Sequence, residues 1–176
     1  MDDLRYPIGR FTYAGSLTED DREACIERIA AAPSRLRLAV KGLTDRQLDT
    51  AYRAGGWTVR QVAHHVPDSH LNAYVRFRLA LTEPNPTIRP YDEAQWAELP
   101  DARSAPVDIS LTLLDALHVR WTLLLRQLGT NDWARTYYHP EQRRTIALDE
   151  VLGLYAWHGE HHVAHITRLR GRMEWK

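Results

Sequence analysis

The sequence predicts an all-α protein built as a four-helix bundle, and three observations support this fold class. Four long segments carry apolar residues at helical spacing, signals for β-strands are few, and no repeat of 20–50 residues occurs. At 176 residues the chain has the size of one domain, which we expect to span residues 1–176. Segments of about 20 residues would form helices roughly 30 Å long, which can pack side by side.

The first long helix is expected to start near Thr18, because Thr18 and the acidic residues after it have the spacing of a capping box. Helix formers continue to Ala32, and Pro33 should bend or break the helix before it resumes and stops near Gly42. Residues 44–48 have the pattern of a short capped turn of helix.

A second long helix is expected from Val59 to Leu81, with Thr58 as its N-cap. Residues 83–106 contain five prolines, which predicts a long connection with at most one helical turn, near residues 93–99. Such a connection is usually functional or wraps the surface. Because it is long enough to return along the bundle, the topology need not be a simple up-down-up-down one.

A third long helix is expected from Ile109 to Leu128 and a fourth from Leu148 to Arg170, where Gly171 should end it. Between them, residues 133–146 predict either an irregular link or a short pair of strands. The bundle therefore has its long proline-rich connection before the third long helix.

Composition excludes several classes of protein. The 23 basic residues balance 23 acidic ones, so there is no excess positive charge to bind nucleic acid or an anionic membrane. The first five residues lack the apolar segment of a signal peptide, so we expect a cytoplasmic protein. The single cysteine, Cys25, rules out an intrachain disulfide and is expected in the core.

Most of the nine histidines fall in two short windows, residues 64–70 and 158–165. In the second window His158, His162 and His165 share a helical face with the apolar residues that should face the core. Two histidines four residues apart on a helix can direct nitrogens at one metal ion. His161 lies at the edge of this face, so a pairing with His158 is an alternative.

In the first window His65 lies at the edge of the apolar stripe of its helix, whereas His64 and His70 are expected to point elsewhere. Three histidines would leave coordination positions open for water or substrate, as catalytic metal sites do. The opposing interpretation is that these are exposed or backbone-bonded core histidines with no metal.

Asp68, one turn after His65, is the candidate catalytic base or orienting residue, and a solvated surface role is the alternative. Glu160 should point away from the histidine face. Residues 89–92 and Trp96 either line a pocket or only pack on the bundle, and His118 is expected to pack in the core.

Several strings of residues together resemble the YfiT proteins of the DinB-like superfamily. The similarity runs in order along nearly the whole chain, through Tyr6-Pro7-Ile8-Gly9, Gly55-Gly56-Trp57-Thr58-Val59-Arg60-Gln61-Val62 with His64-His65, Asp68-Ser69-His70, Ile88-Arg89-Pro90-Tyr91-Asp92, Leu117-His118 with Arg120-Trp121, Tyr138-His139-Pro140, and Gly153-Leu154-Tyr155 with Trp157-His158.

This resemblance implies a DinB-like four-helix bundle, often a homodimer, that holds one divalent metal, zinc or nickel, on His65, His158 and His162. It further implies an enzyme acting on a small molecule, in the first place a metal-dependent hydrolase that activates water. Related DinB-like proteins suggest two alternatives: an S-transferase that joins a low-molecular-weight thiol such as bacillithiol to electrophiles, or a non-catalytic metal- or ligand-binding module.

Two positions depart from the family pattern. Pro67 removes a backbone hydrogen bond to Ala63 and should kink the helix beside His65. Glu160 stands where a relative carries another histidine, so this cluster has one histidine fewer.

Overall fold

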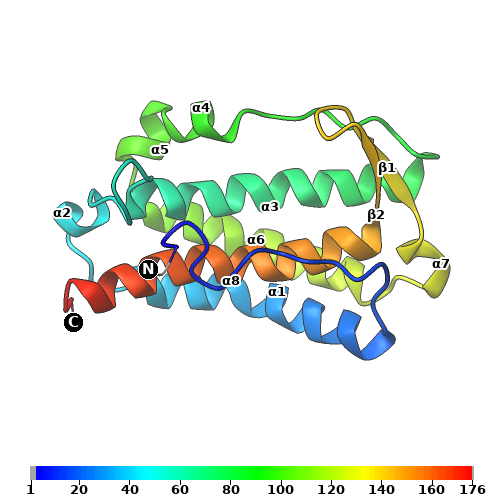
Figure 1. The fold of residues 1–176 in the computed structure, drawn as a ribbon, viewed down its shortest axis with the longest axis horizontal. Coiled ribbons are helices and arrows are strands. Elements are labelled where there is room, and N and C mark those ends of the chain that lie inside the picture. The colour runs from blue at the N-terminus through cyan, green and yellow to red at the C-terminus, as the bar shows by residue number, and fades with distance from the viewer. Residues whose placement is uncertain (1–2, 176) are drawn as a thin grey trace.

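Four long helices form the body of the molecule in the computed structural model, which describes residues 3–175 (Figure 1). They are α1 (Glu19–Val40), α3 (Val59–Thr82), α6 (Val107–Leu125) and α8 (Leu148–Arg172). The all-α four-helix bundle is thereby confirmed. Met1, Asp2 and Lys176 of the expected domain lie outside the described residues.

The shorter elements lie between these helices. They are α2 (Asp45–Leu48), α4 (Glu93–Ala97), α5 (Pro100–Ser104), α7 (Thr130–Trp133), β1 (Thr136–His139) and β2 (Arg144–Ala147). No helix among residues 3–175 is long and apolar enough to cross a membrane.

Threonine side chains begin three of the helices, as the sequence predicts. Thr18, Thr44 and Thr58 each accept a hydrogen bond from the backbone N–H three residues later, and the side chain at that position bonds back to the cap. These reciprocal bonds satisfy N–H groups that the first turn of a helix otherwise leaves unpaired.

Three expectations about helix boundaries are wrong. Helix α1 runs unbroken through Pro33, because packing of its buried face outweighs one missing backbone bond. Helix α8 continues through Gly171 to Arg172. The connection holds a second short helix, α5, which begins at Pro100, where the fixed φ of proline suits a first helical position. Helix α3 also runs without a break through Pro67, and the kink expected there stays a prediction.

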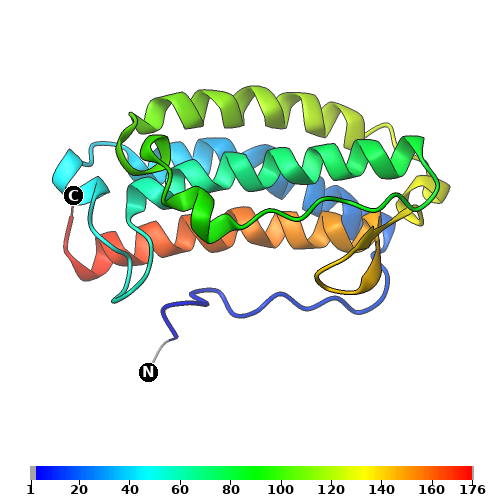
Figure 2. The ribbon, with the colours of Figure 1, turned by 90° about the horizontal axis from the view of Figure 1, so that it is seen from above.

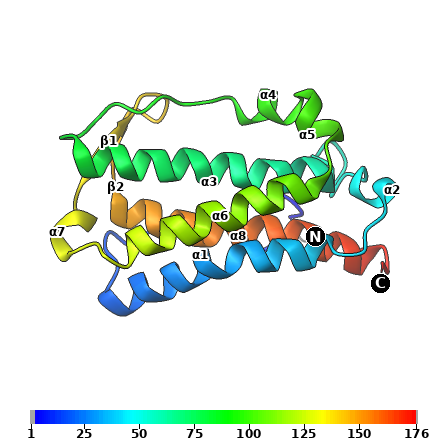
Figure 3. The same ribbon diagram turned by 180° about the vertical axis from the view of Figure 1, so that it is seen from behind.

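The long connection explains the topology of the bundle. Helices α3 and α6 pack against each other and run in the same direction, opposite to α1 and α8 (Figures 1 and 3). The chain must therefore return along the whole length of α3 before α6 begins, and α4 and α5 pack on α3 along this return (Figure 2). The fold is not a simple up-down-up-down bundle.

A short antiparallel hairpin closes one end of the bundle, which confirms the strand-pair alternative for residues 133–146. Thr136 pairs with Ala147 and His139 with Arg144. The connection joins this hairpin, since Tyr138 N donates to Pro86 O at 2.9 Å and Ile88 N donates to Tyr138 O at 3.1 Å. Hairpin and connection thus form one wall beside α3.

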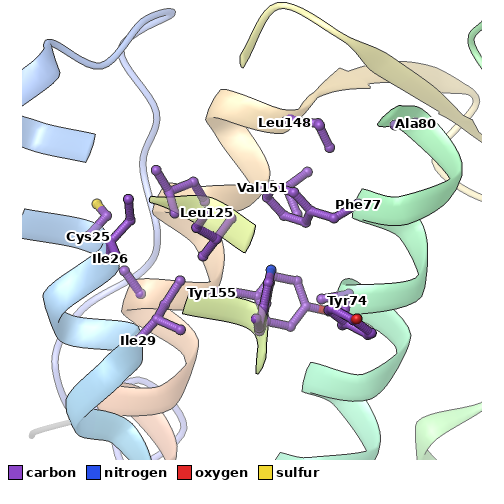
Figure 4. Close-up of a cluster of buried hydrophobic side chains, with 14 of the residues drawn as sticks. Cys25, Ile26, Ile29, Tyr74, Phe77, Ala80, Leu125, Leu148, Val151 and Tyr155 are labelled. Atoms are coloured by element: carbon purple, nitrogen blue, oxygen red, sulfur yellow. The ribbon is translucent and has the colours of Figure 1, made fainter. Parts of the chain in front are cut away.

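The hydrophobic core consists of two clusters rather than one. One cluster, around Phe77, Trp121 and Val151, fills the end near the hairpin and includes the buried Cys25, as the sequence predicts (Figure 4). The other, around Val62 and Leu114, fills the opposite end. On α3 and α8 the residues between the two clusters include histidines, and His118 of α6 contacts one of them, so a polar layer crosses the middle of the bundle.

Asp149, in the first turn of α8, attaches the N-terminal arm to the bundle. Its carboxylate accepts hydrogen bonds from Tyr13 Oη at 2.8 Å, Leu17 N at 2.7 Å and Arg22 Nε at 2.6 Å. A negative charge at a helix N-terminus also interacts favourably with the helix dipole. This buried carboxylate fixes the entry into α1 relative to α8.

Candidate metal centre

Three histidines from two helices converge in the polar layer. His65 projects from α3, and His158 and His162 project from consecutive turns of α8. One nitrogen from each lies within 4.8 Å of the others, and the Nε2 atoms of His158 and His162 are 3.2 Å apart. Nitrogens that share a tetrahedral zinc ion at about 2.0–2.1 Å lie roughly 3.3 Å from each other. The His158–His162 pair already has this spacing, and a small side-chain movement of His65 would complete a three-nitrogen site for a divalent cation.

Burial keeps these imidazoles uncharged. It lowers the pKa of His65 to about 4 and lowers the pKa values of His158 and His162 well below their ordinary value, and the neighbouring histidines add to the effect. The indole of Trp57 packs on His65, with ring centroids 4.6 Å apart. A neutral imidazole offers a lone pair, which is the form that binds metal.

A chain of buried histidines fixes which nitrogen of His158 carries the proton. His118 Nδ1 lies 2.6 Å from Ile29 O, and a carbonyl oxygen only accepts, so His118 donates from Nδ1 and accepts at Nε2. His70 Nδ1 therefore donates to His118 Nε2 at 2.9 Å, and His158 Nδ1 donates to His70 Nε2 at 3.1 Å.

This assignment leaves Nε2 of neutral His158 without a proton, so its lone pair faces the nitrogens of His65 and His162. A metal-binding histidine generally donates its other N–H to a fixed partner, which orients the ring. Here that partner is another histidine rather than a carboxylate.

Pro33 leaves a backbone carbonyl free to accept the hydrogen bond at the α1 end of this histidine chain. In an α-helix the N–H of residue 33 would donate to the carbonyl of Ile29, but proline has no N–H. The Ile29 carbonyl is thus free of that bond and accepts from His118 instead. Gly159 helps too, because a Cβ there would lie 3.1 Å from Ala32 Cβ and 3.7 Å from His70 Cε1.

A cavity of about 430 Å³ adjoins the three histidines. The bundle supplies one side, and the connection and the hairpin supply the other. Of the segment at residues 89–96, Pro90, Tyr91 and Glu93 line the cavity, whereas Trp96 is 39% exposed and packs on Tyr91. The volume suits a small molecule.

Asp68 is not among the residues that line this cavity. Its carboxyl is half-buried, and burial together with the charge of Asp101 raises its pKa to about 6. The structure therefore brings His65, His158 and His162 together but leaves Asp68 apart from them, and the catalytic role of Asp68 stays a prediction.

The predictions that His64 and Glu160 point away from the three histidines are confirmed. His64 turns toward α6, with Nδ1 2.7 Å from Ser110 Oγ and Nε2 3.1 Å from Ala105 O. Glu160 points at α1 and accepts from Arg28 and Arg35, each at 2.6 Å. Neither side chain enters the cavity.

His161 and His165 lie beside the three histidines. His161 lines the cavity. His165 Nε2 donates to Arg5 O at 3.2 Å, and its ring stacks on Tyr52.

The expectation that His70 points away from the site is wrong. His70 is fully buried and contacts His158 directly. Its position gives the signal that could have found it, because it falls three to four residues from Val66, Ala73 and Tyr74, on the stripe that faces the core. His118 packs in the core as predicted, but no sequence pattern shows that it contacts His70 from another helix.

Comparison with known proteins decides the family. Residues 28–166 match the DinB superfamily. The chain belongs to the DinB superfamily.

Relatives with curated names are similar to this DinB superfamily member over their whole length. Proteins of Bacillus mycoides (strain KBAB4) and Bacillus cereus (strain B4264), both named "Putative metal-dependent hydrolase", are 57% identical to it over 175 residues, which is 99% of this chain and 100% of each relative. A solved structure, of YfiT from Bacillus subtilis, matches with a TM-score of 0.97 and 50% identity over 98% of this chain and 99% of that one.

YfiT is described as "a probable metal-dependent hydrolase with an unusual four-helix bundle topology". The parallel packing of α3 and α6 is one way in which the present bundle departs from the simple topology. The resemblance to YfiT proteins inferred from the sequence is confirmed.

Proposed function

We propose that this DinB superfamily member is a hydrolase that uses one divalent cation, held by His65, His158 and His162, to activate water against a small-molecule substrate. The observation that carries the proposal is the convergence of three neutral imidazoles beside a cavity of about 430 Å³. The names of the similar Bacillus proteins support the same class of reaction.

A divalent cation at this site would supply Lewis-acid chemistry, which lowers the pKa of a water toward about 7, or deprotonates a thiol, and polarises a carbonyl. The protein supplies the rest. The histidine chain through His70 orients His158, Trp57 packs on His65, and the hairpin and connection enclose the substrate. Zinc is the first cation to test and nickel the second.

An S-transferase is the second candidate, and one observation favours keeping it. Asp68 does not line the cavity, and the two carboxylates that do, Glu93 and Glu141, belong to exposed residues. Hydrolysis benefits from a nearby general base, whereas a thiol that is already deprotonated needs none.

One experiment separates these functions. The zinc-loaded protein is assayed against a panel of esters and amides, and separately with a low-molecular-weight thiol and an electrophile such as monochlorobimane. Hydrolysis without thiol, lost in His158→Ala and retained in His64→Ala, supports the hydrolase. Turnover only with thiol rejects it in favour of the S-transferase, and absence of both supports a metal- or ligand-binding module.

We further propose a homodimer, an expectation from the family resemblance, which sedimentation equilibrium of the zinc-loaded protein checks. A monomer at micromolar concentration would contradict it.

A further inference from the structure

The cavity beside the three histidines contains a buried cation that the proposed hydrolysis does not use. Arg76 lines the cavity from α3, two turns beyond Ser69, and only 9% of its surface is exposed. A buried arginine is usually paired with a carboxylate, because an unpaired charge away from water is costly. Among residues 3–175, no carboxylate lies within ion-pairing distance of Arg76.

The groups around Arg76 are polar but carry no negative charge. Tyr91, Tyr137, Tyr155 and His139 all lie close enough to feel its charge. Burial raises the pKa of Tyr137 to about 12 and raises those of Tyr91 and Tyr155, so these phenols stay neutral near pH 7. Tyr137 lies within hydrogen-bonding reach of Arg76, and Ser69, which lines the cavity, adds a hydroxyl group that can bind a ligand oxygen.

The two acidic residues of the lining do not neutralise this cation. Glu93 and Glu141 are exposed. Within residues 3–175 the guanidinium thus has a neutral phenol, Tyr137, as a hydrogen-bonding neighbour but no carboxylate, and a planar arginine fork in a partly enclosed space can bind a carboxylate through two parallel hydrogen bonds.

We propose that Arg76 binds a carboxylate of the substrate, so that the substrate is a carboxylated small molecule whose reacting group lies at the three histidines and whose acid group lies at Arg76. This inference rests on the proposed metal-dependent function and names its substrate class. A single cation surrounded by hydroxyls matches the single charge of a carboxylate better than the double charge of a phosphate monoester.

The helix sets the length of such a substrate. Arg76 follows His65 by eleven residues, about 16 Å along the axis of α3, and helical side chains lean toward the N-terminus. His65 leans the same way, but the longer arginine side chain reaches back farther, leaving a gap on the order of 10 Å between the guanidinium and the histidines. A chain of several carbon atoms between the reacting group and the acid would fill it.

Hydroxamates with a carboxylate at the far end test this inference, because the hydroxamate chelates zinc and the chain length can be varied. Calorimetry on the zinc-loaded protein compares the monohydroxamates of succinic to suberic acid with methyl-ended alkanohydroxamates of equal length. At the best length we expect the acid to bind at least 10-fold more tightly. Arg76→Gln should abolish this gain and Arg76→Lys retain part of it. Arg78→Gln, which removes an exposed arginine of the same helix, should leave it unchanged.

The outcomes separate this inference from the proposed function. Failure of acetohydroxamate to bind the zinc-loaded protein would contradict the metal site itself. Binding of acetohydroxamate with no gain from any acid would overturn the carboxylate subsite, a result that needs no variant to fold. A gain that persists in Arg76→Gln would overturn the assignment of the subsite to Arg76. A larger gain from a phosphonate analogue would overturn the choice of a carboxylate as its ligand.

Discussion

His70 Nε2 accepts a hydrogen bond from His158 Nδ1 at 3.1 Å, which connects the proposed metal ligand to a chain of buried histidines that ends on the backbone of α1. The chain explains how a core histidine could serve the proposed metal site without contacting an ion. It keeps the proton on Nδ1 of His158 and the lone pair on Nε2.

Removing His70 should therefore weaken metal binding. We expect His70→Ala to raise the zinc dissociation constant about 10- to 100-fold, because the ring of His158 loses its orienting partner. Competition with a chromogenic chelator measures this. His70→Gln, whose amide oxygen can still accept from His158, should recover most of the affinity.

His64→Ala is the matched control, since His64 is also a buried, hydrogen-bonded histidine of α3 but points at α6. Its zinc affinity should equal that of the parent protein. Equal losses in His70→Ala and His64→Ala would show that general destabilisation, and not the contact with His158, lowers the affinity.

The metal-free protein should lose stability in mild acid. Burial lowers the pKa of His65, His118, His161 and His165 to about 4, whereas unfolded histidine titrates near its ordinary value of 6.5. Between pH 6.5 and 4 the unfolded state thus binds protons that the folded state does not bind. The stability these groups contribute is complete above pH 6.5 and declines as the pH falls toward 4.

Urea unfolding of the metal-free protein between pH 7.5 and 4.5 measures this loss. The free energy of unfolding should fall steeply below pH 6.5, with a slope against pH that corresponds to the binding of several protons on unfolding. A profile that stays flat down to pH 5 would mean that these histidines are not buried and neutral.

Asp68 can be tested both as a catalytic base and as a carboxylate whose ionised form is destabilised by burial. Its folded pKa, about 6, lies above its unfolded value, so its ionised form destabilises the fold above pH 6 and the effect vanishes as the pH falls below 4. Asp68→Asn should therefore raise the melting temperature at pH 7.5 but not at pH 4.

If Asp68 is the base, hydrolysis should increase with pH through about 6 as the carboxyl loses its proton, and Asp68→Asn should lose this limb of the profile. An unchanged profile in Asp68→Asn would exclude the role and agree with the absence of Asp68 from the cavity lining.

Asp149 should be the most sensitive carboxylate for stability. Asp149→Ala removes the partner of Arg22 and two further hydrogen bonds in one step, which should cost about 3 kcal/mol of unfolding free energy. Chemical denaturation measures the change. Glu160→Ala, whose arginine partners are more exposed, should cost less than about 1 kcal/mol, and a larger loss than in Asp149→Ala would refute this ranking.

The sequence was sufficient for the parts of the molecule that depend on local patterns. Thr18, Thr44 and Thr58 mark helix starts through their own side chains, and the spacing of His158 and His162 places both on one face of one helix. These features are set within a few residues of the chain, so helical geometry alone recovers them.

Features that depend on contacts between helices could not be recovered in this way. Pro33 is a helix breaker by local rules, yet in the bundle it leaves a carbonyl free for His118 of another helix. Arg76 is an ordinary charged residue in the sequence, and only the structure shows that it is buried beside a cavity that the connection and hairpin also line. Both become informative once the packing of α1, α3, α6 and α8 is known.

The zinc content of the purified protein tests the central claim most directly. Equilibrium dialysis against zinc, read by elemental analysis, should give one ion per chain for the parent protein and for His161→Ala, whose imidazole neighbours the three proposed ligands without belonging to them. His65→Ala, His158→Ala and His162→Ala should each bind far less than one ion at the same free zinc concentration. Unchanged loading in any of these three variants would contradict the three-histidine site.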